Sequence, residues 1–390
     1  MPKLPTFKVA LVGGGSGGHI YPLVAVTRTL RRYLQDNGAY LDARYFGSAG
    51  NYDAYLEREG VKVLHVATSK MRRYFSIQNF FDVFKFFYGF FEALTKLYFF
   101  MPDVLFSKGG AGAYGTILAA RWYRIPVVIH ESDAVAGITN RQSAKHAVMV
   151  DLAFEEAKKY FSIKANTKVV GLPVRKTIAL KENPNTSRLE FGFSSQLPTI
   201  FLVGGSQGAN ALNEFVLENP EILLKNFHII HQTGENNHKD YKAQFDFVTK
   251  NFKKEIKQNY YSAAYLNDHQ MAAALNAADL VVSRAGSSIW EIASVGKPSI
   301  LIPIPASAND HQRANAYSYA KAGAAVVIEE ENLRGNIFLT QVNKILSDQN
   351  KLAEMSEAAK KFFRPESAEL IAADLLDASN ISNQILGAEK

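Results

Sequence analysis

Two similar glycine-rich segments constrain the fold of this chain more than any other feature of its sequence. The first, VALVGGGSGGH at 9–19, and the second, TIFLVGGSQGAN at 199–210, each indicate a strand, a glycine loop and the start of a helix. Further short apolar runs, separated by helix-like segments, lie at 104–107, 127–129, 280–283 and 299–302. Such runs are typical of parallel strands that are buried on both faces and joined by helices. We therefore expect an α/β fold with two similar, Rossmann-like doubly wound parallel-sheet domains.

The length of 390 residues suits two domains of roughly 150 to 200 residues each. Residues 176–198 are rich in Asn, Ser, Lys and Pro without apolar periodicity, which indicates a connection between domains. The sequence thus predicts a first domain over 1–175 and a second over 176–364. Because Pro365 would break a helix, a final helix is predicted over about 365–390, where it packs back on the first domain.

The composition narrows the chemistry and the compartment. Because the chain has no cysteine, disulfides, thiolate catalysis and cysteine-ligated zinc are excluded. The net charge of +7 suits a phosphorylated substrate, an anionic lipid surface or nucleic acid, and charge alone does not choose among them. Residues 1–12 lack the apolar stretch and cleavage site of a signal peptide, so a cytoplasmic location is expected.

Aromatic side chains crowd into residues 71–101, with Phe86, Phe87, Phe90 and Phe91 near the centre. Several of the aromatic residues recur at helical spacings of three and four. Acidic and basic residues interrupt the run, which disfavours a transmembrane span and favours an amphipathic helix at a membrane surface. Packing of the same aromatic residues against the sheet is an equally good interpretation, because helical aromatic stripes usually belong to a core.

The first glycine loop carries Ser16, Gly17, Gly18 and His19 into the following helix. Glycines let a ligand approach the backbone closely, and a helix start offers unpaired N–H groups to phosphate. The loop is not a dinucleotide fingerprint, because no clear acidic residue follows a second strand about 20 residues later. His19 is a candidate general base beside a reacting hydroxyl. A plain tight turn with a structural histidine is the alternative.

The second domain offers further groups for a nucleotide ligand. Its glycine loop adds Ser206 as a hydroxyl donor. After the predicted strand at 280–283, Ser287 and Ser288 precede Glu291. The N–H groups of this turn suit a diphosphate, and the carboxylate suits two ribose hydroxyls. Helix capping is the alternative role for the two serines.

A helix is predicted to begin near 310, after a proline-containing loop. Gln312 and Asn315 lie on one face of this helix at three-residue spacing, and their amides suit the hydroxyls of a sugar. The neighbouring Asp310 and His311 point apart and lack an evident third ligand. We therefore expect no metal site there.

Together these segments resemble the motifs of the MurG family of N-acetylglucosaminyltransferases, which is glycosyltransferase family 28. The motifs occur in family order as GGGSGGHIYP, HESDAVAGITN, VVGLPVR, VGGSQGANALN, SRAGSSIWEIASVGKP and NDHQRANAYSYAKAGAA. The resemblance implies a GT-B fold, in which the two domains face a central cleft. It also implies inverting transfer of N-acetylglucosamine (GlcNAc) from UDP-GlcNAc to the 4-hydroxyl of lipid I, which is undecaprenyl-pyrophosphoryl-N-acetylmuramoyl-pentapeptide. The product would be lipid II of peptidoglycan synthesis, made with no metal or other cofactor.

The resemblance also implies roles for residues at matching positions. Ser16, Gly17 and Gly18 would bound the sugar-phosphate side of the cleft, with His19 as the candidate base. The implied donor contacts are Arg175 and Ser206 to the nucleotide, Glu291 to the ribose, Gln312 and Asn315 to the donor sugar, and the backbone of Leu266 to uracil.

Three departures from the family pattern affect these implied roles. The usual HEQN motif, on the acceptor side, is here His130, Glu131, Ser132 and Asp133, so a carboxylate stands where the family has an amide. Asp133 is therefore expected either to share the base role or to bind a sugar hydroxyl. The other departures are a one-residue shortening within 284–291, a lengthening by about two before Met271, and an altered GGY element at 109–114.

A lipid-linked acceptor gives the aromatic segment a specific interpretation. A patch of Phe86, Phe87, Phe90 and Phe91, with neighbouring basic residues, would hold the protein peripherally on the anionic cytoplasmic face of the bacterial cell membrane. UDP-GlcNAc and lipid I are the expected partners, and nucleic acid is not. Two alternatives stay open: a GT-B transferase that acts on another membrane lipid, and a non-catalytic nucleotide-sugar-binding membrane adaptor. A dinucleotide-dependent oxidoreductase is disfavoured, because the ribose-binding acid is missing.

Overall fold

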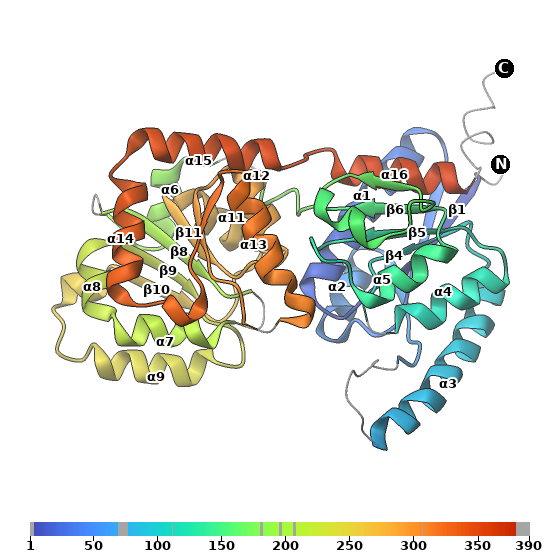
Figure 1. Cartoon of the computed structure of the whole chain (residues 1–390), viewed down its shortest axis with the longest axis horizontal. Helices are drawn as coiled ribbons and strands as arrows, with labels where there is room; N and C mark the ends of the chain where they lie inside the picture. The colour runs from blue at the N-terminus through green and yellow to red at the C-terminus, as the bar shows by residue number, and fades with distance from the viewer. Residues whose placement is uncertain are drawn as a thin grey trace. The chain divides into compact units, whose positions relative to one another are not determined.

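The computed structural model describes residues 4–68, 77–110, 112–179, 182–194, 197–205, 208–305 and 307–379. The chain divides into two compact units. Figure 1 colours the chain from blue at its N-terminus to red at its C-terminus. Unit 1 comprises Met1–Pro173 and Pro365–Lys390, and unit 2 comprises Val174–Arg364. Arg175, the last residue of the first domain in the sequence-based prediction, belongs to unit 2.

The sheet of unit 1 has seven parallel strands in the order β3-β2-β1-β4-β5-β6-β7. These strands are β1 (Thr6–Val12), β2 (Tyr40–Phe46), β3 (Val61–Leu64), β4 (Val104–Ser107), β5 (Val127–Glu131), β6 (Met149–Leu152) and β7 (Thr167–Val169). The chain runs from β1 outward to β3 and then returns to place β4 on the other side of β1. In open α/β sheets, ligands bind beyond the carboxyl ends of the strands at such a reversal. The loops after β1 and β4 therefore occupy the favoured position for a ligand.

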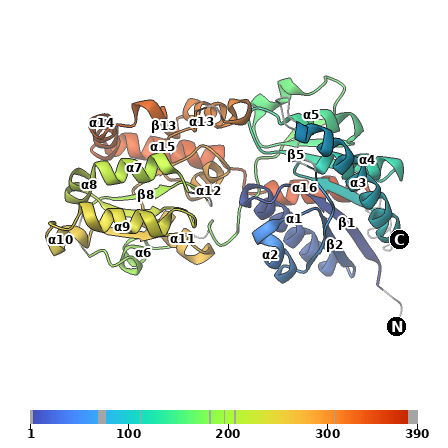
Figure 2. The ribbon, with the colours of Figure 1, turned by 90° about the horizontal axis from the view of Figure 1, so that it is seen from below.

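Helices cover both faces of this sheet. The helices are α1 (Gly17–Asp36), α2 (Asp53–Arg58), α3 (Ile77–Phe100), α4 (Ala113–Trp122), α5 (Ile138–Ser143) and α16 (Ser367–Ala378), with short 3-10 turns η1 (Gly50–Tyr52), η2 (Ala144–His146) and η3 (Glu155–Tyr160). Apolar residues of α1, α2 and α16 form one core layer, and those of α3 and α4 form the other. Figure 2 shows α3 beside α4.

Helix α16 joins unit 1 although it follows unit 2 in the sequence. Its Ile371 and Leu375 are fully buried in the core layer that α1 also lines. Two polar contacts tie the helix to the end of the sheet: Ser367 Oγ donates to the carbonyl of Val170 at 2.7 Å, and Lys168 Nζ lies 2.9 Å from both carboxylate oxygens of Asp374. The last described residue of the chain, Ser379, follows directly after this helix.

Unit 2 repeats the architecture with a parallel sheet of six strands in the order β10-β9-β8-β11-β12-β13. The strands are β8 (Thr199–Val203), β9 (His228–Gln232), β10 (Tyr260–Ala263), β11 (Leu280–Ser283), β12 (Ser299–Leu301) and β13 (Ala325–Val327). The reversal of strand order falls between β8 and β11, so the loops after these two strands again occupy the favoured ligand position. The prediction of two doubly wound parallel sheets is confirmed, and each of the six apolar runs forms a strand.

The helices of unit 2 also form two layers. They are α6 (Pro184–Glu190), α7 (Asn210–Glu218), α8 (Pro220–Asn226), α9 (His238–Val248), α10 (Lys254–Lys257), α11 (Asp268–Ala277), α12 (Ser288–Val295), α13 (His311–Lys321), α14 (Gly335–Leu346) and α15 (Gln349–Phe362), with 3-10 turns η4 (Ala308–Asp310) and η5 (Glu330–Asn332). One core layer combines the sheet with α7, α8, α9 and α14, and the other combines it with α11 and α12.

Candidate active site

The loop between β1 and α1 ends at the exposed Ser16, whose backbone is extended at the helix N-cap position. The hydroxyl of Ser16 makes no capping bond, whereas its carbonyl accepts from the N–H groups of His19 and Ile20. Gly17 and Gly18 open a helix of 20 residues, and first-turn N–H groups have no partner within their own helix. Together with the helix dipole, these groups suit an anionic ligand at the carboxyl edge of the sheet.

His19 is held by the glycine loop that precedes it. Its Nδ1 accepts a 2.8 Å hydrogen bond from the backbone N–H of Gly14. A backbone N–H can only donate, so the neutral ring carries its proton on Nε2. Burial, and then the positive charge of Lys108, lower the pKa of His19 to about 4, against the opposing effect of Asp133. His19 is therefore a neutral hydrogen-bond donor at pH 7.

The loop after β4 packs on this histidine. Gly110 adopts a φ of +89°, and a Cβ built there would lie 3.0 Å from Cε1 of His19. Only glycine combines this backbone conformation with such a close approach. The preceding residue pair, Lys108 and Gly109, links the same loop to the strand, and the N–H of Lys108 donates to the carbonyl of Val12 at 2.8 Å. The loops after β1 and β4 thus form one continuous structure.

Lys108 is a buried cation that sequence analysis missed. Its side chain donates to Ser132 Oγ at 2.6 Å and makes a short contact with Nδ1 of His130. Nε2 of His130 donates to the carbonyl of Gly171 at 2.8 Å. Burial lowers the pKa of Lys108 to about 7, although the neighbouring acidic side chains Glu131, Asp133 and Asp151 oppose this shift. A single lysine between the apolar strand VLFS and two glycines was the available signal.

The motif HESD, which the family resemblance assigned to the acceptor side, places its first two side chains inside unit 1. Glu131 is buried, and burial raises the pKa of its carboxyl group. The carboxylate accepts from the N–H of Asp133 at 3.0 Å, the N–H of Gly137 at 2.9 Å and Nδ2 of Asn140 at 2.9 Å. Glu131 therefore shapes the loop that presents Asp133, which is itself only half-buried.

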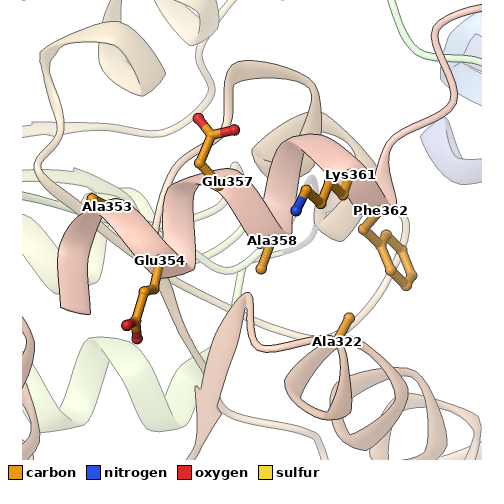
Figure 3. Close-up of a pocket in the computed structure, with 7 residues that line it drawn as sticks. All are labelled: Ala322, Ala353, Glu354, Glu357, Ala358, Lys361 and Phe362. Atoms are coloured by element: carbon orange, nitrogen blue, oxygen red, sulfur yellow. The ribbon is translucent and has the colours of Figure 1, made fainter. Parts of the chain in front are cut away.

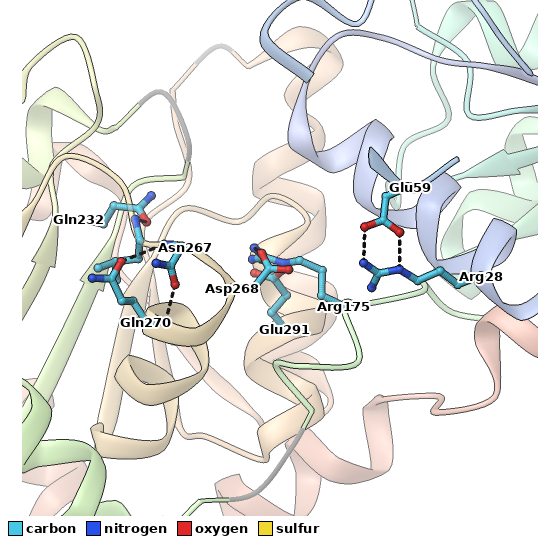
Figure 4. A network of polar contacts seen from close by, with 9 residues as sticks. Arg28, Glu59, Arg175, Gln232, Asn267, Asp268, Gln270 and Glu291 are labelled. Atoms are coloured by element: carbon cyan, nitrogen blue, oxygen red, sulfur yellow. Dashed lines mark hydrogen bonds and ion pairs between the residues drawn. The ribbon is translucent and has the colours of Figure 1, made fainter. Parts of the chain in front are cut away.

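In unit 2, Arg175 gathers two acidic side chains from different helices (Figure 4). Its Nε and Nη2 donate to Oε1 of Glu291 at 3.0 and 2.7 Å, and its Nη1 donates to Oδ1 of Asp268 at 2.7 Å. The Arg175 side chain is only 5% exposed, so these partners compensate a buried charge. Glu291 lies in the first turn of α12 and Asp268 in the first turn of α11. Asp268 was not predicted as part of the site.

Leu266 joins two loops at the carboxyl edge of the same sheet. Its N–H donates to Oε1 of Gln232, and Nε2 of Gln232 donates to the carbonyl of Gly205 in the second glycine loop. The next residue, Asn267, caps α11 through a reciprocal capping box with Gln270, as drawn in Figure 4. Sequence analysis missed Gln232, whose amide fixes both loops. Ser206 of the second loop lies outside the described residues.

The remaining predicted residues surround the loop after β11. Ser288 Oγ lies 2.9 Å from Ser283 Oγ and donates to the carbonyl of Arg284 at 3.1 Å, whereas Ser287 occupies the N-cap position of α12 without a side-chain capping bond. Asn315 on α13 is buried and donates to the carbonyl of Ala285 at 3.1 Å. Gln312 is half-buried, and its Oε1 accepts from the N–H of Ile304. Unit 2 thus brings most of the predicted donor residues to one edge of its sheet.

Helix α3 separates the four phenylalanines of the predicted membrane patch into two pairs. Phe86 and Phe90 are half-buried, and the ring of Phe86 stacks on Tyr114 of α4. Phe87 and Phe91 are 54% and 61% exposed. The exposed side of the helix continues with Phe84, Tyr88, Tyr98 and Phe99.

A separate hollow of about 660 Å³ lies between α13 and α15 in unit 2 (Figure 3). Ala358 and Phe362 of α15 face Ala322 across it, with Glu354 and Lys361 at its border. None of the residues predicted for the site lines this hollow. Within the described ranges, no group of three or more His, Asp or Glu side chains is arranged to hold a metal ion. Likewise, no described helix is both long and apolar enough to cross a membrane.

Comparisons with known proteins cover both units. Residues 9–150 match the model of the glycosyltransferase family 28 N-terminal domain, and residues 199–371 match that of the family 28 C-terminal domain. A protein of Clostridium tetani named UDP-N-acetylglucosamine--N-acetylmuramyl-(pentapeptide) pyrophosphoryl-undecaprenol N-acetylglucosamine transferase is 33% identical over 347 residues, covering 88% of this chain and 91% of that protein. A protein of the same name from Desulforamulus reducens is 33% identical over 374 residues, covering 92% and 95%.

Solved structures agree with this result. The crystal structure of Acinetobacter baumannii MurG matches with a TM-score of 0.71 at 27% identity, over 95% of this chain and 99% of that one. A UDP-GlcNAc 2-epimerase from Neisseria meningitidis, solved with UDP-GlcNAc bound, matches with a TM-score of 0.65 at 14% identity, over 95% and 100%. The second likeness shows the fold alone. From the family models, the relatives and the MurG structure, the chain belongs to glycosyltransferase family 28 and has the GT-B fold.

Proposed function

We propose that this chain transfers GlcNAc from UDP-GlcNAc to the 4-hydroxyl of lipid I and so forms lipid II for peptidoglycan synthesis. The main support is 33% identity, over about nine tenths of the chain, with transferases named for this reaction. The ligand positions of the two sheets agree with it, because each carries a glycine loop and polar side chains at the carboxyl ends of its strands.

Unit 2 is assigned to the donor. Both hydrogen bonds from Arg175 to Glu291 end on Oε1, so we assign Oε2 of Glu291 to the ribose hydroxyls. Arg175 then acts by holding Glu291 rather than by reaching the nucleotide itself. The N–H groups of the loops after β8 and β11 are assigned to the diphosphate, and Gln312 is assigned to the donor sugar. Asn315 supports this site through its bond to the loop carbonyl of Ala285.

Unit 1 is assigned to the acceptor, with Asp133 as the base. In the neutral His19 ring, Nε2 already carries a proton and Nδ1 accepts from the N–H of Gly14. Neither nitrogen is therefore available to take the proton of the hydroxyl. We therefore assign His19 as a donor to a substrate oxygen and Asp133 as the proton acceptor. The 4-hydroxyl gives its proton to the Asp133 carboxylate while its oxygen bonds to C1 of GlcNAc. The bond from C1 to the diphosphate breaks on the opposite face, and UDP leaves with the electron pair.

The exposed aromatic side of α3 is assigned to a membrane surface. A lipid-linked acceptor requires the acceptor-binding unit to work at the bilayer, and exposed Phe87 and Phe91 offer apolar contact area there. The positive net charge favours anionic lipid on the cytoplasmic face. The protein would thus be peripheral, with UDP-GlcNAc and lipid I as partners and without a nucleic-acid partner.

A transfer assay tests the proposed function. Radiolabelled UDP-GlcNAc and a short-chain lipid I analogue are expected to give a labelled lipid product that contains one more GlcNAc. Transfer to diacylglycerol but not to the lipid I analogue would identify a different membrane-lipid transferase. Binding of UDP-GlcNAc without transfer to either acceptor would identify a non-catalytic adaptor. Both of these results would overturn the proposal.

A further inference from the structure

The strongest unexplained feature of unit 1 is a lysine whose charge is buried beside the acceptor site. Lys108 follows β4 directly, at the strand-order reversal where the glycine loop after β1 also lies. The residue is only 3% exposed, so its ammonium group does not reach a ligand in solution. Burial of a cation is costly unless neighbouring groups compensate it. The contacts of Lys108 therefore indicate what the residue does.

Those contacts fix the acceptor-side loop. His130 donates through Nε2 to the carbonyl of Gly171, so Nδ1 of its neutral ring is an acceptor. Lys108 donates to this Nδ1 and to Ser132 Oγ at 2.6 Å. One amino group thus binds both the end of β5 and the first residue of the loop that carries Asp133.

The charged and titratable groups around Lys108 come from several elements. His130 and Glu131 belong to β5, Asp133 to the loop after it, His19 to α1 and Asp151 to β6. The two histidines are neutral at pH 7, because burial and the charge of Lys108 lower their pKa values. Glu131 is occupied by three hydrogen bonds within its own segment.

Asp151 does not compete for Lys108 as a full negative charge. Its carboxyl group is completely buried beside Asp374, and burial raises its pKa to about 8. Of the three acidic side chains that face Lys108, only Asp133 is partly exposed. The lysine therefore holds, through Ser132, the loop whose acidic side chain a substrate can reach.

We propose that Lys108 is a positioning residue for GlcNAc transfer, whose ammonium group fixes the loop of Ser132 and Asp133 through its hydrogen bonds to Ser132 and His130. This inference rests on the proposed function. It departs from a histidine-based site, because a buried lysine holds the loop of Asp133 while His19 and His130 stay neutral. Since the pKa of Lys108 lies at about 7, its charge is lost at mildly alkaline pH.

The test compares kcat for transfer to the lipid I analogue between pH 6 and pH 9. In the unchanged protein, kcat is expected to fall by about tenfold between pH 7 and pH 8.5, because the hydrogen bonds to Ser132 and His130 weaken as Lys108 loses its charge. Lys108→Met is expected to lower kcat at pH 6.5 by at least about tenfold and to abolish the alkaline fall. Lys108→Arg, which stays charged at every pH tested, is expected to retain more activity than Lys108→Met at pH 8.5. The KM for UDP-GlcNAc is expected to stay unchanged in both variants.

Matched controls separate this role from a structural one. Lys62→Met removes an exposed lysine of β3 in the same unit and is expected to leave kcat and the pH profile unchanged. Melting curves identify a variant that fails to fold. In that case Ser132→Ala removes the other partner of the same hydrogen bond, and this variant is expected to have a lowered kcat. An unchanged alkaline fall in Lys108→Met, or a raised KM for the acceptor without a change in profile, would overturn the proposal. If the unchanged protein transfers nothing, the proposed function itself fails instead.

Discussion

The backbone N–H of Gly14 donates a 2.8 Å hydrogen bond to Nδ1 of His19. This bond decides which ring nitrogen carries the proton and therefore what the histidine can do. Because Nδ1 is an acceptor, Nε2 of the neutral ring is a donor. Burial lowers the pKa of His19 to about 4, so the ring stays neutral throughout the range in which the transferase is assayed. A histidine in this state stabilises developing charge by donating a hydrogen bond.

The first prediction concerns the side chain that replaces His19. His19→Ala is expected to lower kcat by about 100-fold or more, because a donor at a reacting oxygen is lost. His19→Gln keeps an N–H donor but is not a base, so its kcat is expected to exceed that of the alanine variant by about tenfold. Steady-state kinetics with the lipid I analogue measure both values, and the KM for UDP-GlcNAc is the internal control. If both variants are equally inactive, and if the rate of the unchanged protein falls below pH 6.5, the result would instead identify His19 as a base.

The sequence predicted the framework of this site better than its contacts. The apolar runs and the repeated glycine segments depend on local patterns, and these patterns identified β1 and β8 with their loops. The proton position on His19 depends on one backbone group, and the burial of Lys108 depends on β4 and β5 meeting in the sheet. Neither relationship produces a periodic pattern in the sequence from which it could be predicted.

The sequence patterns also did not predict which distant residues form ion pairs or which face of a helix is buried. Arg175 was predicted to contact the nucleotide and Glu291 the ribose, as separate residues. The two side chains, 116 positions apart, form one ion pair. The spacing of the phenylalanines predicted an apolar helix. It did not show that Phe86 would pack on α4 while Phe87 stayed exposed, because that depends on how α3 lies against its neighbour.

The second prediction tests the contact between Arg175 and Glu291. Glu291→Gln is expected to raise the KM for UDP-GlcNAc by about tenfold or more with a smaller effect on kcat, because a ribose ligand acts in ground-state binding. Arg175→Lys is expected to change KM in the same direction, since lysine cannot hold Glu291 and Asp268 at once. Glu190→Gln, on α6 of the same unit, is the matched control and should leave KM unchanged. A fall in kcat with an unchanged KM would argue against a ribose contact.

The third prediction separates the two sides of α3. The double change Phe87→Ser with Phe91→Ser is expected to weaken binding to vesicles of phosphatidylglycerol and phosphatidylcholine by at least about tenfold, without a lower Tm. Phe86→Ser is expected to lower Tm, because this ring packs on Tyr114. Vesicle flotation and thermal melting measure these effects.

The control for the membrane surface lies on unit 2. Phe247 of α9 is 68% exposed, so Phe247→Ser removes a comparable aromatic surface from outside the proposed patch. This variant is expected to bind vesicles as the unchanged protein does. If Phe247→Ser and the double change on α3 weaken binding equally, the attachment is a general property of exposed aromatic residues and α3 is not the membrane surface.

The fourth prediction uses the buried carboxyl group of Asp151 to test how α16 is held on unit 1. Asp151 lies on β6 beside Asp374, which pairs with Lys168. Burial, and then the charge of Asp374, raise the pKa of Asp151 from 3.8 to about 8, whereas Lys168 and Lys108 oppose the shift. Between these two values the folded protein holds a proton that the unfolded chain has released. The free energy of unfolding contributed by this group is therefore complete below pH 3.8 and is lost as pH rises toward 8.

Asp151→Asn removes this dependence, because the amide does not titrate. From pH 5 to pH 7 the loss in the unchanged protein amounts to about 3 kcal/mol, which corresponds to roughly 6–12 °C in Tm for a domain of about 200 residues. The difference in Tm between Asp151→Asn and the unchanged protein is thus expected to grow by that amount in favour of the variant. Lys108 is charged in both the folded and unfolded states over most of this range, so it contributes little to the difference. Asp36→Asn, an exposed residue at the end of α1, should show no such growth. A constant difference for Asp151→Asn would mean that its carboxyl group is already ionised in the folded protein at pH 5.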